Sequence, residues 1–149
     1  MIKPSTIQPD IELRDALAGH ITVGSAGGGT ASVAVYGDWG RPTNALPDDF
    51  ITIYINGNPQ GVSMDTPFVK GTLMVSLYCK LNDDGSIKRN RIQKILAQFE
   101  EAIQKYISEN YFFEYDSLQF ITPTTPNYTS GYSVTILNLR WNTTSNFNK

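Results

Sequence analysis

The chain has little of what catalytic and metal sites are most often built from. Its 149 residues include a single cysteine, Cys79, and a single histidine, His20. One cysteine excludes a disulfide within the chain and a cysteine-based metal cluster, and one histidine excludes metal sites that need two. Cys79 lies in an alternating apolar run, so we expect a small buried side chain rather than a nucleophile. We expect His20 to be solvated, because it follows Gly19, which can end a helix.

Charge is also scarce, since only 17% of the residues are charged and the formal net charge is -2. This balance provides no general attraction for nucleic acid or an anionic membrane, so any contact with DNA would have to be local. Nowhere do 18 apolar residues run together, and the first ten residues hold no continuous apolar segment. We therefore expect no membrane association and a protein made in a reducing cytoplasm.

Two short segments have the composition of ligand-binding loops but the wrong spacing. The glycine-rich stretch Gly24–Thr30 matches neither phosphate-binding glycine motif and follows a helix rather than a strand, so we expect a flexible connector. Counted from Asn82 as a calcium loop, position six is Ile87 and position twelve is Gln93, where glycine and glutamate are needed. The segment is expected to be a turn before a helix, with its carboxylates favoured by the helix dipole. We predict no catalytic, cofactor-binding or metal-binding residue.

The carboxylates adjacent in sequence form no acid/base pair by themselves. Asp48 and Asp49 adjoin in a predicted loop, and Glu100 and Glu101 adjoin on a predicted helix. Neighbouring side chains point apart on a helix, so neither pair is expected to act together. A pair contributed by positions distant in sequence stays open.

The clearest structural feature present is a helix predicted over Ser86–Ser108. Its apolar residues recur at steps of three and four, while polar residues fall on the other side. The apolar stripe comprises Ile92, Ile95, Leu96, Phe99, Ala102, Ile103, Tyr106 and Ile107, and the polar side comprises Gln93, Lys94, Gln98, Glu101 and Lys105. Burying each large side chain contributes about 1.5 to 3 kcal/mol before ordering costs. Such a helix is expected to lie on a sheet.

The remaining elements predict one α+β domain over residues 1–141, followed by a polar tail over residues 142–149. A first helix is predicted over Thr6–Ala18. Strands are predicted over Ala31–Tyr36, Phe50–Asn56, Phe68–Leu81, Leu118–Thr122 and Tyr132–Trp141. In the third of these, alternate residues are apolar and their neighbours half polar, which is typical of an antiparallel sheet covered on one side. We therefore predict a two-layer sandwich, with a mainly antiparallel sheet of four to five strands covered by both helices.

Three surface features are candidate interfaces. The loop Gly37–Asp49 presents Trp39 and Arg41 between glycine and proline, as an interface anchor would, although Trp39 could instead cap the sheet edge. The predicted loop Asn56–Thr66 contributes Asn58 and Gln60. The basic cluster comprises Lys88, Arg89, Arg91 and Lys94. Three interpretations of the cluster stay open, namely a solvated face, a subunit contact and a nucleic-acid contact.

The order and length of these elements resemble the tail terminator proteins of long-tailed bacteriophages. The matching parts are the helix Thr6–Ala18, the strands around Val33–Tyr36, Phe50–Asn56 and Phe68–Leu81, the long helix after Asp84, and the strand Tyr132–Trp141. Members of this family are small α+β subunits that form a hexameric ring on the end of the tail tube, and they have no catalytic residues.

The resemblance implies a structural virion protein, assembled in the host cytoplasm, that is not an enzyme. Its implied partners are further copies of itself, the tail tube protein and the head-tail connector or neck protein, with DNA only passing through the ring. One alternative is a head-completion or neck adaptor protein. The other is a small-ligand or enzymatic domain with a site assembled from Asp38, Arg41, His20 and Tyr54, which would need a concave apolar pocket.

Overall fold

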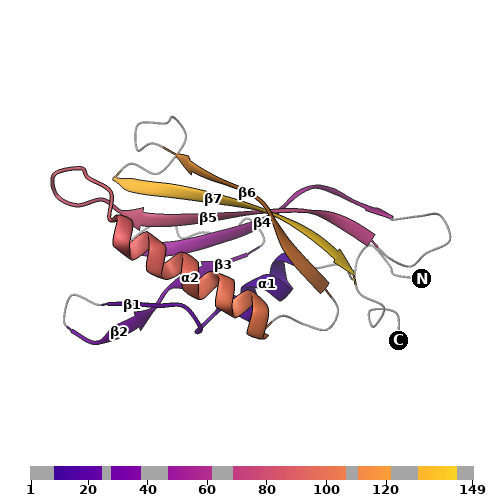
Figure 1. Ribbon diagram of the computed structural model, residues 1–149, viewed down its shortest axis with the longest axis horizontal. Helices are drawn as coiled ribbons and strands as arrows, with labels where there is room; N and C mark the ends of the chain where they lie inside the picture. Colours follow the sequence, from indigo (N-terminus) through magenta and orange to yellow (C-terminus); the bar gives the residue numbers. More distant parts are fainter. Residues whose placement is uncertain are drawn as a thin grey trace.

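In the computed structural model, two helices lie against one face of a five-stranded sheet, and a two-stranded hairpin lies beside the longer helix (Figure 1). The structure describes residues 9–24, 28–37, 47–61, 69–106, 111–121 and 131–143. The fold is the predicted α+β class with a mainly antiparallel sheet.

The helices are shorter than the sequence predicts at the ends that the structure describes. Helix α1 spans Pro9–Leu17, and its first residue is a proline whose missing N–H is not needed there. Gly19 follows with a φ of 77°, a left-handed conformation that ends the helix at low cost. Helix α2 spans Arg89–Tyr106, whereas residues 86 to 88 precede it as irregular chain. Of the predicted stripe, Ile92, Ile95, Phe99 and Ala102 are buried against the sheet and Leu96 and Ile103 are partly buried, while the Tyr106 side chain and Ile107 lie outside the described part.

The five-stranded sheet has the order β3-β4-β5-β7-β6. Its strands are β3 (Ala34–Tyr36), β4 (Asp49–Gly61), β5 (Val69–Lys80), β6 (Tyr111–Ile121) and β7 (Tyr132–Thr143). Strand β3 pairs with β4 in parallel, and all other pairs are antiparallel. The last strand of the chain, β7, therefore lies inside the sheet, and the edge opposite β3 is formed by β6.

Several boundaries differ from the prediction. The run predicted as one strand, Ala31–Tyr36, is two strands in different sheets, because Val33 turns inward and donates its N–H to the carbonyl of Ile21 at 2.8 Å. The second of them is β3, and the first, β2 (Thr30–Ser32), pairs with β1 (Thr22–Gly24) as an antiparallel hairpin. Part of the predicted glycine-rich connector is therefore strand.

Strands β4, β6 and β7 extend further than predicted, whereas β5 spans Val69–Lys80 within the predicted Phe68–Leu81. Strand β4 continues through Gly61 with an irregularity between Asn56 and Gln60, so residues 56 to 61 are strand rather than loop. Residues 111 to 121 form the single strand β6, which begins before the predicted strand Leu118–Thr122. Strand β7 runs to Thr143, which is buried and pairs with Tyr111, so the first two residues of the predicted tail belong to the sheet.

Among the described elements both helices lie on one face of the sheet, but the opposite face is more apolar than predicted. The helix face carries the larger cluster, in which Leu73, Val75 and Leu77 of β5 lie under the stripe of α2. The opposite face carries a second cluster of Phe50, Tyr78, Tyr132, Val134 and Ile136, each at most 8% exposed. Its aromatic rings pack on one another, and the Phe50 and Tyr78 rings stack with centroids 4.5 Å apart. The alternating pattern predicts a half-polar face because it counts the tyrosines as polar. Their rings are largely apolar, so they can form a buried cluster on this face.

Candidate functional site

Two adjoining hollows lie between the β1–β2 hairpin and the first half of α2. One, of about 420 Å³, is lined by Val23, Gly24, Ala31, Ser32, Val33, Pro47, Asp48, Asp49, Lys88 and Arg91. The other, of about 460 Å³, is lined by Thr22, Val23, Gly24, Thr30, Arg91 and Lys94. We call these two hollows together the basic hollow. The hollow combines valine side chains with lysines, so it can accept a group that is partly apolar and partly anionic.

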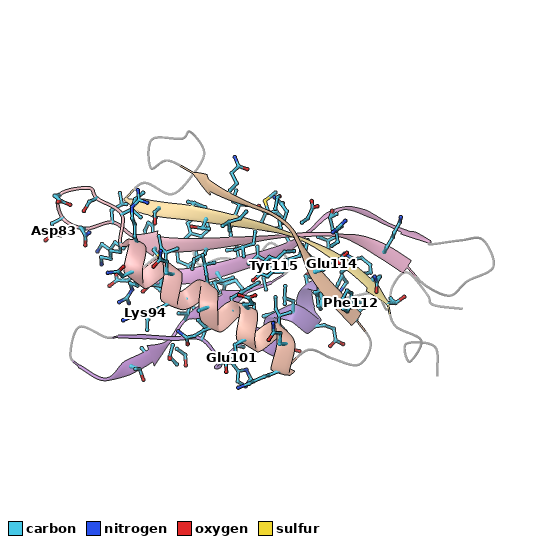
Figure 2. All side chains as sticks on the ribbon, in the orientation of Figure 1. Asp83, Lys94, Glu101, Phe112, Glu114 and Tyr115 are labelled. Atoms are coloured by element: carbon cyan, nitrogen blue, oxygen red, sulfur yellow. The ribbon has the colours of Figure 1, made fainter. Side chains whose placement is uncertain are left out.

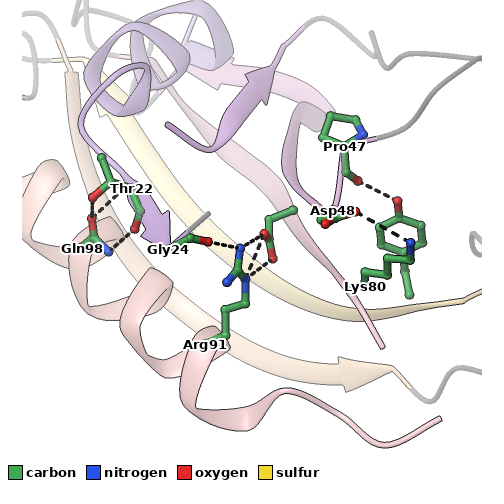
Figure 3. Close-up of polar contacts among 9 residues, drawn as sticks. Thr22, Gly24, Pro47, Asp48, Lys80, Arg91 and Gln98 are labelled. Atoms are coloured by element: carbon green, nitrogen blue, oxygen red, sulfur yellow. Dashed lines mark hydrogen bonds and ion pairs between the residues drawn. The ribbon is translucent and has the colours of Figure 1, made fainter. Parts of the chain in front are cut away.

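The basic hollow is built around an ion pair between Arg91 and Asp49 (Figure 3). The Asp49 side chain is only 4% exposed, and Arg91 donates to both of its carboxylate oxygens, with the closest contact from Nη2 to Oδ2 at 2.6 Å. The same Nη2 donates to the Gly24 carbonyl at 3.1 Å. Arg91 of the predicted basic cluster therefore ties α2 to β4 and β1, and the hydrogen bond to Asp49 raises the pKa of its guanidinium.

A second polar bridge attaches the hairpin to the helix (Figure 3). The Gln98 amide accepts the backbone N–H of Thr22 at 2.8 Å through its oxygen and donates to the Thr22 carbonyl at 2.8 Å through its nitrogen. One side chain thus satisfies both backbone groups of a strand residue as a neighbouring strand would. The sequence predicts Gln98 on the polar side of α2. Periodicity within the helix cannot reveal the contact, because the hairpin that covers that side is a separate segment of the chain.

Cys79 lies behind the ion pair and is fully buried, as the sequence predicts. Burial raises the pKa of its thiol well above the ordinary range, and the nearby Asp49 carboxylate raises it further. A thiol that stays protonated is a poor nucleophile. The side chain therefore contributes to packing.

The other members of the predicted cluster lie on two sides of the start of α2. Lys88 and Lys94 line the basic hollow, and neither has an ion-pair partner among the residues that the structure describes. Arg89 instead borders a smaller hollow of about 250 Å³ on another side of α2, with Ile87, Ile92, Gln93 and Leu96. The cluster therefore divides into a structural arginine, two lysines at the basic hollow and one separate arginine.

Strand β6 forms an open sheet edge with exposed side chains on both of its faces. Phe112 is 53% exposed and shares the face away from the helices with Glu114, while Tyr115 and Leu118 lie on the helix face and are 42% and 49% exposed (Figure 2). Glu114 and Asp116 both approach the Arg140 guanidinium, at 3.3 Å and 3.9 Å. Partial burial raises the pKa of Tyr115 to about 12, and the charge of Glu100 on α2 adds to the shift. This edge is apolar and acidic, and no sequence pattern singled it out.

Of the other predicted site residues, those that the structure describes are not brought together with these. Trp39, Arg41 and Asp38 lie outside the described residues. Asn58 and Gln60 belong to β4, where Gln60 pairs with Lys70 of β5. His20 follows α1 on the helix side and its Nδ1 contacts the Ala16 carbonyl at 3.1 Å, whereas Tyr54 shares the other face of the sheet with Phe50. The structure therefore separates His20 from Tyr54.

The segment Asn82–Ser86 forms a closed turn, as predicted. Ser86 donates both its backbone N–H and its hydroxyl to Asp84 Oδ1, at 2.9 Å and 2.6 Å, and Gly85 has a φ of 84°. The hydroxyl hydrogen bond lowers the pKa of Asp84. The predicted dipole contribution is wrong, because α2 begins only at Arg89 and has no acidic residue in its first turn.

In the described part of the chain, no three histidine, cysteine, aspartate or glutamate side chains group as metal ligands would. Among the described helices, none is both long and apolar enough to span a membrane. Neither a scan against models of known protein families nor a search among curated proteins finds a match to this chain.

Proposed function

We propose that the protein is a structural subunit of a phage tail, a tail terminator that caps the tail tube as a ring and presents a surface to the head connector. The observation that carries the proposal is the order of elements, which is a helix, a group of strands, a long helix and two final strands, with both helices packed on a mainly antiparallel five-stranded sheet. This order is the one on which the resemblance to tail terminators rests.

The surfaces are compatible with assembly. An edge strand of 11 residues with exposed apolar side chains is a ready template for contact with another chain. The basic hollow combines apolar and charged side chains, and it lies over a buried ion pair that holds the fold together. These features favour a protein contact over a small-molecule site, which is typically an enclosed, mostly apolar pocket.

The test is light scattering coupled to gel filtration, with the purified protein alone and after mixing with the tail tube protein of the same virus. We expect a species near six times the subunit mass of 16.6 kDa, on its own or on the tube. A strict monomer that never binds the tube would exclude the terminator function. Binding to the head connector without binding to the tube would indicate the head-completion or neck adaptor role instead.

A variant at the predicted loop anchor refines this test. Trp39→Ala is expected to weaken assembly and to leave the melting temperature of the isolated subunit unchanged, since an interface anchor contributes to binding more than to folding. Arg41→Ala is the matched second variant. A fall of several degrees in melting temperature with assembly intact would mean that Trp39 caps the sheet edge.

A further inference from the structure

We infer that the basic hollow is the docking site for the acidic edge strand β6 of a second copy of this chain. The inference rests on the proposed ring function and names the surfaces that would close the ring. It is carried by three observations on described residues, namely opposite charge, matching apolar content and placement on opposite sides of the molecule.

The charges of the two surfaces are opposite. At the basic hollow, the described residues Lys88, Arg91, Lys94 and the adjacent Lys80 provide four cations against the carboxylates of Asp48 and Asp49, which leaves two positive charges among these groups. On β6, Glu114 and Asp116 share the Arg140 guanidinium, and Glu100 of α2 adds a third carboxylate near Tyr115 on the helix face, so these groups together leave two negative charges. Complementary charge steers association and fixes its register.

The apolar groups also match. Phe112 and Glu114 are two residues apart in β6, so a phenyl ring and a carboxylate protrude side by side from one face of the strand. The hollow offers the half-buried Val23 side chain, and Lys88 and Lys94 also line it. A phenyl ring packed on Val23 would bring the neighbouring carboxylate toward these lysines.

The two surfaces lie on opposite sides of the subunit (Figure 1). Strand β6 is one edge of the sheet, whereas the β1–β2 hairpin lies on the other side of α2, near the end of the sheet formed by β3 (Figures 1 and 2). A contact between two different surfaces of identical subunits is head-to-tail, and such contacts generate closed rings or open filaments.

The decisive experiment uses two charge-reversal variants of the full chain. Lys88→Glu with Lys94→Glu makes the hollow negative while β6 stays negative, and Glu114→Lys with Asp116→Lys makes β6 positive while the hollow stays positive. Each variant alone is expected to lose at least about tenfold in self-association by sedimentation, because like charges then meet at every contact. A 1:1 mixture is expected to recover association, since each hollow then meets an edge of opposite charge.

Controls separate folding from assembly. Lys105→Glu reverses an exposed charge in the last turn of α2, far along the helix from the hollow, and is expected to associate as the wild type does. A cysteine pair, Lys94→Cys in one preparation and Glu114→Cys in another, provides a second measurement that needs no charge reversal. Because Cys79 is buried, we expect the mixture to give one disulfide-linked dimer under mild oxidation.

The outcomes distinguish this inference from the proposed function. A ring that forms equally well from either charge-reversed variant, or no cross-linked dimer, would overturn the inference and leave the ring proposal standing. Failure of the mixture to recover association would overturn it too, as would binding of duplex DNA that needs Lys88 and Lys94 while self-association does not. Recovery in the mixture, without binding to tube protein, would support the contact and contradict the terminator function.

Discussion

At the scale of single residues, the Arg91–Asp49 pair is the polar contact on which the fold depends most. Replacing Arg91 by methionine leaves the Asp49 carboxylate, which is 4% exposed, without its partner. We expect Arg91→Met to lower the free energy of unfolding by about 3 kcal/mol, measured by urea denaturation. Adding Asp49→Asn should recover part of the loss, since the uncompensated charge is then removed.

The matched control is Lys105→Met, which removes the cation of an exposed pair with Glu101 on the same helix. Exposed ion pairs contribute little to the free energy of unfolding, so Lys105→Met should lower it much less than Arg91→Met does. Equal losses in the two methionine variants would show that Arg91 is not structural.

The buried thiol of Cys79 gives the stability of the protein a defined dependence on alkaline pH. Burial raises the pKa of the folded thiol, whereas an unfolded cysteine has a pKa near ~8.5. Below that pH both states hold the proton, and above it only the unfolded state releases it. The free energy of unfolding should therefore fall as pH rises past the unfolded pKa, by up to about 1.4 kcal/mol per pH unit.

The comparison that isolates this effect is Cys79→Ala, measured by urea denaturation between pH 7 and pH 10. Other groups titrate in both proteins, so the readout is the difference in slope between them. The wild type should lose stability more steeply than the variant above the unfolded pKa. Parallel curves would mean that the folded thiol ionises normally.

Gly71 is required by a close approach rather than by its backbone conformation. A Cβ at this position of β5 would lie 2.8 Å from Cζ2 and 2.9 Å from Nε1 of Trp141, whose side chain is 1% exposed. We expect Gly71→Ala to destabilise by about 1 to 3 kcal/mol, because the indole has no room to move aside. Urea denaturation followed by circular dichroism measures the loss. Wild-type stability in the variant would show that the ring shifts freely.

At the scale of elements, the β1–β2 hairpin depends on one side chain of the neighbouring helix. Gln98→Ala removes both hydrogen bonds to the Thr22 backbone, and we expect a loss of about 1 to 2 kcal/mol. Hydrogen exchange at the Thr22 amide should accelerate while the amides of β5 stay protected. Gln104→Ala, on an exposed position of α2, is the control and should change neither quantity. Unchanged exchange at Thr22 in Gln98→Ala would mean that the strand is held by its own pairing.

The elements that the sequence predicts best are those whose pattern is local. The stripe of α2 and the alternation in β4, β5 and β7 appear within one segment, so periodicity identifies them. The parallel pairing of β3 with β4 depends on residues from separate segments meeting in space, as does the split at Val33. No local pattern encodes either of them.

Only part of the candidate site could be predicted from the sequence, for the same reason. The lysines and arginines of the basic cluster are adjacent in sequence, so the cluster is evident from composition. Asp49 is 42 residues away from Arg91, and its carboxylate was predicted to lie in a loop. The sequence alone does not show that Arg91 is bound to Asp49 while Lys88 and Lys94 border a hollow. That difference depends on where β4 lies relative to α2.

At the scale of the whole molecule, the two apolar clusters share strands and should unfold together. Alternate residues of β5 and β7 enter the helix-side cluster and the aromatic cluster on the other face. We therefore expect one cooperative transition in urea, with the same midpoint by far-ultraviolet circular dichroism and by the near-ultraviolet signal of the tyrosines. Two separate midpoints would show that the faces are independent.

The position of β7 has a consequence for how the chain is made. During synthesis the segments emerge from the N-terminus onward, yet the strand that completes the sheet is encoded last and must enter between β5 and β6. Until β7 is in place, the backbone N–H and C=O groups along one side of β5 have no partner strand. The growing chain therefore exposes two unpaired strand edges, those of β5 and β6. A nascent chain of this protein is thus vulnerable to pairing with neighbouring chains on the same messenger until β7 has emerged from the ribosome.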